Sequence, residues 1–161
     1  MYITLPHIII IFTLTIGLSY IAWKDYKEQE ISFIALGAMI VFSVFAMLYS
    51  NTFNYLDLGL GVLIGIIPFS LMALTSKGGI GDIFLMGTLG LILGSRGIIY
   101  LILLSGLFYL IFGLVIIYYF SKEEKGSFKE GLKKQYPYAP FVLMGWMAYL
   151  VIGFIEVVIG G

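Results

Sequence analysis

The sequence predicts an all-α membrane protein, a polytopic bundle of six transmembrane helices in a single domain over residues 1–161. Two observations lead to this fold class. Hydrophobic residues make up 61% of the chain and charged residues only 11%, at a mean hydropathy of +1.06, which excludes an ordinary water-soluble domain. The apolar residues also gather in runs of about 20, the length that a helix needs to cross a bilayer. The lipid bilayer is therefore the first partner that the composition implies.

Six such runs account for nearly all of the chain, and we expect one spanning helix in each. They cover residues 3–23, 31–49, 55–75, about 80 or 82 to 97, 98–120 and 140–159. A polar segment at 24–30 separates the first two helices, and the longest polar loop covers residues 121–138.

Eight of the nine basic residues lie in the loops that follow the first, third and fifth expected helices. They are Lys24, Lys27, Lys77, Lys122, Lys125, Lys129, Lys133 and Lys134. Short loops rich in lysine and arginine stay in the cytoplasm, so these loops are expected to be cytoplasmic and both termini to lie outside. Asp25 and Asp82 then share the cytoplasmic face of the membrane, although they lie far apart in sequence.

Asp82 is the acid whose position most needs an explanation. It ends the stretch Lys77-Gly78-Gly79-Ile80-Gly81-Asp82, which lies between two long apolar runs. Asp82 and Arg96 are 14 positions apart, and a helix of that length covers about 21 Å of a bilayer core about 30 Å thick. The fourth helix is thus expected to be short and to start up to about 9 Å below the cytoplasmic surface. Irregular backbone at that depth is tolerated only where it is buried in protein or lines a water-filled cavity. The glycine stretch is therefore expected to form the bottom of a water-filled notch.

Asp25 and Asp82 are the candidate catalytic residues. Two carboxyl groups in one low-dielectric site cannot both ionise easily, so such a pair holds one proton over a wide pH range. Amide hydrolysis needs this state, because the carboxylate takes a proton from the attacking water while the carboxylic acid polarises the carbonyl. The two acids therefore predict bond cleavage by general acid–base catalysis.

The three glycines near the second acid, Gly78, Gly79 and Gly81, lack a Cβ atom. An extended substrate backbone could approach them closely, so we count them, with Lys77, as substrate-binding candidates. We expect no metal or other cofactor, because the chain has no cysteine and its single histidine, His7, lies at the start of an apolar run. A formal net charge of zero gives no reason to expect a nucleic-acid partner.

Each of these features has a structural alternative. Asp25 by itself fits an interfacial charge paired with Lys24 or Lys27, and glycines in membrane helices are commonly packing residues. Asp57, near the outer end of the third helix, is interpreted as an interfacial or inter-helix polar contact. One alternative function is a small ion- or proton-coupled transporter or channel subunit, in which Asp82 would be the proton or cation site. A purely structural membrane subunit is the other.

Three short motifs occur in order along the chain. The first is Asp25 followed six residues later by Ile31, and the second is Gly79-Ile80-Gly81-Asp82. The third is Tyr136-Pro137-Tyr138-Ala139-Pro140-Phe141, which is similar to a Pro-Phe-x-Pro-Phe segment that opens a last helix. Together they resemble the type IV prepilin peptidase and preflagellin peptidase family of GxGD aspartyl proteases.

The resemblance implies that Asp25 and Asp82 form the catalytic dyad of an aspartyl endopeptidase, and it adds Pro140 and Phe141 to the substrate-binding candidates. It also implies the substrate, a prepilin-like or preflagellin-like precursor whose short basic leader is cut off at the cytoplasmic face. This chain has Ile31-Ser32-Phe33 where the family usually has Ile-Pro-Asn, a departure at the start of the second helix. It lacks cysteines and room for the cysteine-rich domain of the large members, so we expect a peptidase without N-methyltransferase activity.

Overall fold

The computed structural model describes residues 5–50, 54–74, 79–123 and 137–159, and within them it contains helices and no strand. The helices are α1 (Leu5–Glu28), α2 (Phe33–Ser50), α3 (Tyr55–Leu74), α4 (Ile80–Glu123) and α6 (Ala139–Ile159). Three described stretches are long and apolar enough to cross a membrane: Leu5–Glu28, Tyr55–Leu74 and Ile80–Val115. The all-α prediction is confirmed, whereas the number of spans and the side of the termini stay predictions.

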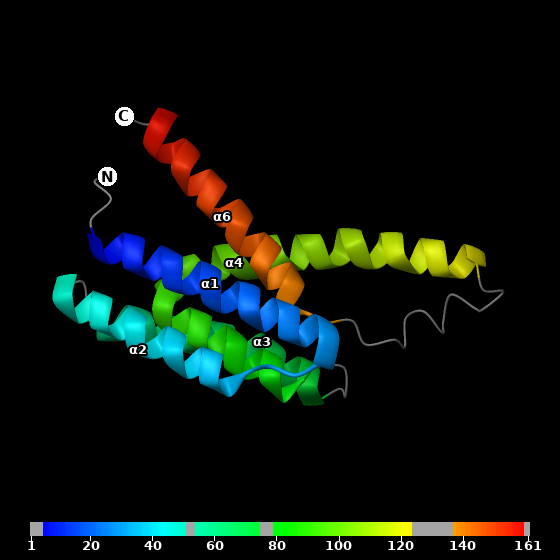
Figure 1. The fold of residues 1–161 in the computed structure, drawn as a ribbon, viewed down its shortest axis with the longest axis horizontal. Helices are drawn as coiled ribbons and strands as arrows, with labels where there is room; N and C mark the ends of the chain where they lie inside the picture. The colour runs from blue at the N-terminus through cyan, green and yellow to red at the C-terminus, as the bar shows by residue number, and fades with distance from the viewer. Residues whose placement is uncertain (1–4, 51–53, 75–78, 124–136, 160–161) are drawn as a thin grey trace.

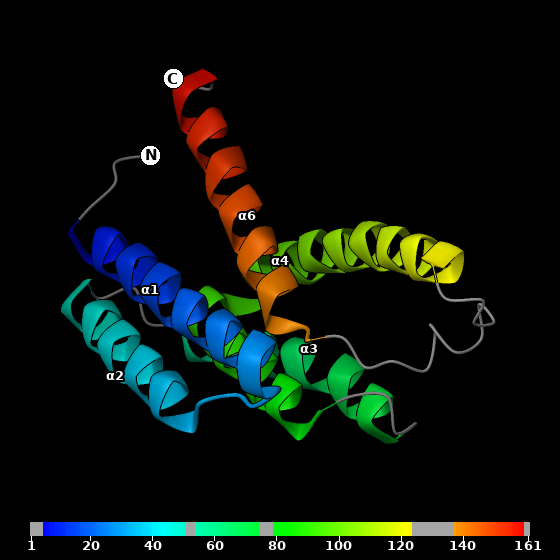
Figure 2. The same ribbon diagram turned by 45° about the vertical axis from the view of Figure 1, so that its right-hand side comes forward.

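The bundle consists of α1, α2, α3 and the first part of α4, which lie side by side, while α6 and the second part of α4 diverge from it (Figures 1 and 2). The fully buried side chains of Leu14, Leu18 and Leu89 belong to a core that also includes Trp146 of α6. The indole Nε1 of Trp146 donates a hydrogen bond of 3.0 Å to the hydroxyl of Thr15. This bond and the core packing hold α6 against α1.

A kink divides α4 into two parts. Gly94 is non-helical, with φ 70° and ψ −176°, a backbone conformation that glycine adopts at little cost. Asp57 of α3 accepts hydrogen bonds from both the backbone N–H and the hydroxyl of Ser95, so it caps the second part of α4. The interpretation of Asp57 as an inter-helix polar contact is confirmed. The kink also lies next to residues 95–97, where the sequence placed the end of the fourth helix.

Glycines let α3 and the first part of α4 approach until their backbones touch. A Cβ atom added at Gly61 would overlap the carbonyl oxygen of Gly90, and one added at Gly65 would overlap the carbonyl oxygen of Met86. Small residues spaced four apart are typical of close helix pairs in membranes, because they allow extensive van der Waals contact. This packing fixes the start of α4 relative to α3.

α1 extends further than the sequence predicted. The expected helix stopped at residue 23 and left 24–30 as a polar segment, whereas α1 continues to Glu28 and includes Asp25. An ion pair one helical turn apart supports the extension, with Lys24 Nζ 3.5 Å from Glu28 Oε2. The helix ends at Glu28, and the next residue, Gln29, has φ 54° and donates its backbone N–H to the carbonyl of Asp25 at 2.9 Å. Asp25 therefore lies on a helical turn and not in a loop.

α2 begins with a serine cap. The Ser32 hydroxyl accepts a hydrogen bond from the backbone N–H of Ala35 at 3.4 Å, and its carbonyl accepts from Leu36 at 3.1 Å. Serine is among the residues most favoured at this position, because its oxygen satisfies a free N–H of the first turn. The Ile31-Ser32-Phe33 sequence thus still provides a capped start for the second helix.

Candidate active site

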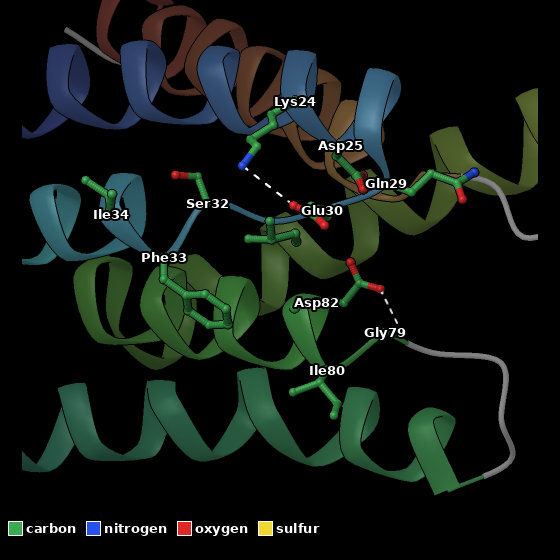
Figure 3. A pocket seen from close by; sticks show the side chains of 12 residues that line it. Lys24, Asp25, Gln29, Glu30, Ser32, Phe33, Ile34, Gly79, Ile80 and Asp82 are labelled. Carbon is green, nitrogen blue, oxygen red and sulfur yellow. Dashed lines mark hydrogen bonds and ion pairs between the residues drawn. The ribbon is translucent and has the colours of Figure 1, made fainter.

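Asp25 and Asp82 line one pocket, although 57 positions separate them in sequence. The pocket has a volume of ≈ 740 Å³ and is formed by the last turns of α1, the connection to α2 and the start of α4. Figure 3 shows the two carboxyl groups facing the space between α1 and α4. The structure therefore brings together the two acids that the sequence analysis paired.

Asp82 caps the helix on which it lies. Its backbone N–H donates to the carbonyl of Gly79 at 3.1 Å, while its Oδ2 atom accepts the backbone N–H of Gly79 at 3.3 Å. The side-chain bond is the half of a capping box in which the third helical residue accepts from the N-cap N–H, and it fixes the side chain against the first turn of α4. The amino end of a helix also carries partial positive charge, which stabilises a carboxylate there. Asp82 is thus held in place by its own helix (Figure 3).

Asp25 is held by a different helix. Its side chain is only 6% exposed, and its Oδ2 atom accepts the backbone N–H of Ala139 at 2.9 Å. Ala139 is the first residue of α6, so Asp25 lies at the positive end of that helix dipole. The contact offsets the unfavourable position of a carboxylate near the carboxyl end of α1. Each acid is therefore oriented by the amino terminus of a helix.

Neither lysine beside Asp25 pairs with it. Lys24 Nζ lies 3.5 Å from Glu28 Oε2 and 3.8 Å from Glu30 Oε2, and Lys27 Nζ lies 4.7 Å from the ring centroid of Trp23. The alternative of an ordinary interfacial charge paired with these lysines is therefore wrong for Asp25. Its position in a shared pocket needs another explanation.

The substrate-binding candidates near Asp82 divide into two groups. Lys77 and Gly78 lie outside the described residues. Gly79 and Gly81 line the pocket, but a Cβ atom added at Gly81 would lie 3.0 Å from both Cβ and Cγ1 of Ile31. The position that a side chain would take at Gly81 thus faces the connection between α1 and α2. The absence of a side chain lets that connection approach the start of α4.

Replacing Gly81 by Ala is expected to lower the rate of substrate turnover by roughly tenfold, because a 1 Å displacement at a reacting centre can cost up to about 10²-fold. The added methyl group would push Ile31 away and separate the walls of the pocket that carry the two acids. The measurement is the rate of substrate cleavage at saturating substrate. Gly37→Ala in α2 is the control, since a Cβ atom there meets nothing within 4 Å. A Gly81→Ala protein as active as Gly37→Ala would contradict this role.

The candidates Pro140 and Phe141 lie in the first turn of α6 and are not among the residues that line the pocket. The Phe141 side chain is buried, and its ring packs against Tyr109 at 5.2 Å and Phe112 at 6.2 Å between centroids. Phe141 thus joins α6 to the second part of α4. A contact of either residue with substrate stays a prediction.

Sequence analysis missed two residues that support the site. The Tyr138 hydroxyl lies 2.9 Å from the Ser105 hydroxyl, and Tyr138 directly precedes the residue that donates to Asp25. The sequence predicted that the last helix begins near Pro140, but no signal in it tied that start to Ser105. In the part of the chain that the structure describes, no three His, Asp or Glu side chains gather as metal ligands would.

Fold and site together define a class: an all-helical protein with apolar spans in which two acids from separate helices share a pocket at one end of the bundle. A profile of the type IV leader peptidase family matches residues 12–114, a range that contains both acids. This chain belongs to the type IV leader peptidase family, and the resemblance drawn from its motifs is confirmed. Comparisons with curated proteins and with solved structures gave no significant match. The chain is thus a protease of the leader peptidase type.

Proposed function

We propose that this protein is a membrane aspartyl endopeptidase that removes the basic leader from pilin-like or archaellin-like precursors at the cytoplasmic face of the cell membrane. The observation that carries the proposal is the common pocket of Asp25 and Asp82 in a chain of the leader peptidase family. Because each carboxyl group accepts a backbone N–H, the pair is oriented before substrate arrives. Such preorganisation favours catalysis.

The proposed reaction uses the two acids and one water. The ionised carboxyl group takes a proton from the water, and the water oxygen bonds to the carbon of the scissile carbonyl. The protonated carboxyl group first polarises the carbonyl oxygen and then gives its proton to the leaving amine as the C–N bond breaks. The pair ends with one proton, as it began. No metal or cofactor takes part in this scheme.

The proposed topology has six spans, with both termini outside and the whole chain as one transmembrane peptidase domain. The kink at Gly94 supports it, because it divides the long α4 into two helical segments, which this topology counts as two spans. The eight lysines of the three loops expected to be cytoplasmic support the orientation. In this topology the pocket of the two acids opens to the cytoplasm, where a basic leader would remain.

The walls of the pocket suit a peptide at the border between water and lipid. Lys24 and Glu30, which form an ion pair of 3.8 Å, bring polar side chains to the pocket, while Phe33, Ile34 and Ile80 bring apolar ones. A substrate with a polar leader before an apolar helix would meet a polar and an apolar wall. Gly79 lies at the pocket next to Asp82, so an extended substrate backbone could pass close to the acids there.

The test is a cleavage assay on the purified protein in liposomes, with a precursor that carries a short basic leader before an apolar helix. The expected result is one cut between leader and helix, identified by mass spectrometry. The alternative function, an ion- or proton-coupled transporter, is examined in the same liposomes. Ion or proton flux that requires Asp82 but not Asp25, without precursor cleavage, would replace the peptidase proposal.

Cleavage is expected to continue at an unchanged rate after treatment with a metal chelator such as EDTA, followed by removal of free metal. In the scheme a carboxylate base activates the attacking water, and no metal ion is needed for this step. The measurement compares initial rates before and after treatment, and a thermal melt of both samples controls for loss of folded protein. A rate that falls with chelator and returns with added divalent metal would contradict the two-acid scheme.

A further inference from the structure

The starting point is the amino terminus of α6, which holds Asp25. The bond from the Ala139 N–H to Asp25 Oδ2 is buried and joins residues that are 114 positions apart. Its geometry depends on where α6 begins relative to α1. An anchor that fixes the start of α6 would therefore also fix the carboxyl group of Asp25.

Tyr138, directly before Ala139, provides such an anchor. Its hydroxyl lies 2.9 Å from the hydroxyl of Ser105, in the second part of α4. The Ser105 hydroxyl also lies 3.2 Å from the carbonyl of Ile102, an acceptor for its hydrogen, which leaves its oxygen free to accept from Tyr138. Ser105 is fully buried, so water does not compete for this bond.

The Tyr138 ring is fixed from two further sides. Its centroid lies 5.2 Å from that of Phe69 in α3 and 5.7 Å from that of Tyr109 in α4. Burial raises the pKa of Tyr138 to about 12, so the hydroxyl keeps its proton, and its capacity to donate, at all physiological pH values. The carbonyl of Tyr138 also accepts from Phe141 at 3.0 Å and Val142 at 3.2 Å, which begins α6.

We propose that Tyr138 is a positioning residue for Asp25, and that its bond to Ser105 holds the start of α6 where Ala139 can donate to the carboxyl group. The inference rests on the proposed function of Asp25. It assigns Tyr138 no contact with substrate or water. Because Ser105 lies in the second part of α4, that segment helps to position the carboxyl group of Asp25.

Tyr138→Phe removes one oxygen atom and keeps the ring contacts. We expect kcat to fall roughly tenfold, less than the ~10²-fold that a full 1 Å misplacement can cause, with KM unchanged. Ser105→Ala should cause a similar fall, and the double variant should be no worse than either single one, because both remove the same bond. Tyr100→Phe is the matched control, since it removes the same hydroxyl group from an exposed tyrosine that takes no part in the bond to Ser105.

A second measurement does not depend on cleavage. Hydrogen–deuterium exchange of the Ala139 amide, followed by mass spectrometry of the peptide that contains it, should be faster in Tyr138→Phe than in wild type and Tyr100→Phe. Unchanged exchange, a wild-type kcat for Tyr138→Phe, or additive losses in the double variant would overturn the positioning role. Failure of wild type to cleave any precursor would instead overturn the proposed function, and the exchange result would still decide whether Tyr138 holds Ala139.

Discussion

Precursor cleavage is expected to fall by about 10²- to 10⁴-fold when either Asp25 or Asp82 is replaced by Asn. Asparagine keeps the size and one accepting oxygen of the side chain, so the bonds from Ala139 and Gly79 can persist. Proton transfer is what the variants lose, because an amide neither takes a proton from water nor gives one to the leaving amine. The measurement is the initial rate of leader removal by each purified variant at equal concentration of folded protein.

Asp57→Asn is the matched control for these variants. Asp57 also caps a helical segment, through Ser95, but it lies in another part of the bundle and does not line the pocket. Its replacement should leave the cleavage rate close to that of wild type. Full activity of either Asp25→Asn or Asp82→Asn would exclude the two-acid mechanism. An equal loss in Asp57→Asn would point to damage to the fold and not to the chemistry.

The thermal stability of the protein in detergent is expected to drop sharply when Gly61 is replaced by Ala. The added Cβ atom would overlap the carbonyl oxygen of Gly90, a backbone atom that cannot rotate away. α3 and α4 would have to separate, and overpacking of this kind costs typically about 1–3 kcal/mol and occasionally more. Because α4 carries Asp82, cleavage should fall together with stability. The measurement is the melting temperature from aggregation or tryptophan fluorescence.

Gly59→Ala provides the comparison on the same helix. A Cβ atom at Gly59 meets nothing within 4 Å, so the methyl group is accommodated, and the better helix propensity of alanine is the remaining effect. Gly59→Ala should therefore melt at or slightly above the wild-type temperature. If both variants melt alike, the close approach of α3 and α4 does not contribute to stability in the way that the structure indicates.

The helices could be predicted closely because their signals are local. Length and apolarity alone located α3 at Tyr55–Leu74 to within a residue, and they left the start of α4, at Ile80, uncertain by two residues. The carboxyl end of α1 could not be located in this way. A polar run from Lys24 onward resembles a loop by composition, but the ion pair of Lys24 with Glu28 and the left-handed Gln29 decide that the helix ends after Glu28.

The pairing of the acids was predictable for a different reason. The distribution of lysines predicted the same membrane face for Asp25 and Asp82, and the surrounding glycines drew attention to Asp82. The sequence predicted that these glycines border the site, but not what each of them contacts. Gly81 faces Ile31 of this chain, a contact between distant segments that the spacing of residues does not reveal.

The sequence by itself indicated the membrane class, most of the helix positions, the family and the two candidate acids, because hydropathy, charge distribution and short motifs are properties of neighbouring residues. Only the tertiary structure decided what holds those acids. Asp25 receives its hydrogen bond from Ala139, which Tyr138 and Ser105 secure, and Asp57 caps the second part of α4. Such bonds depend on how the helices cross and pack. They join residues far apart in the chain, and no local pattern in the sequence reveals these pairs.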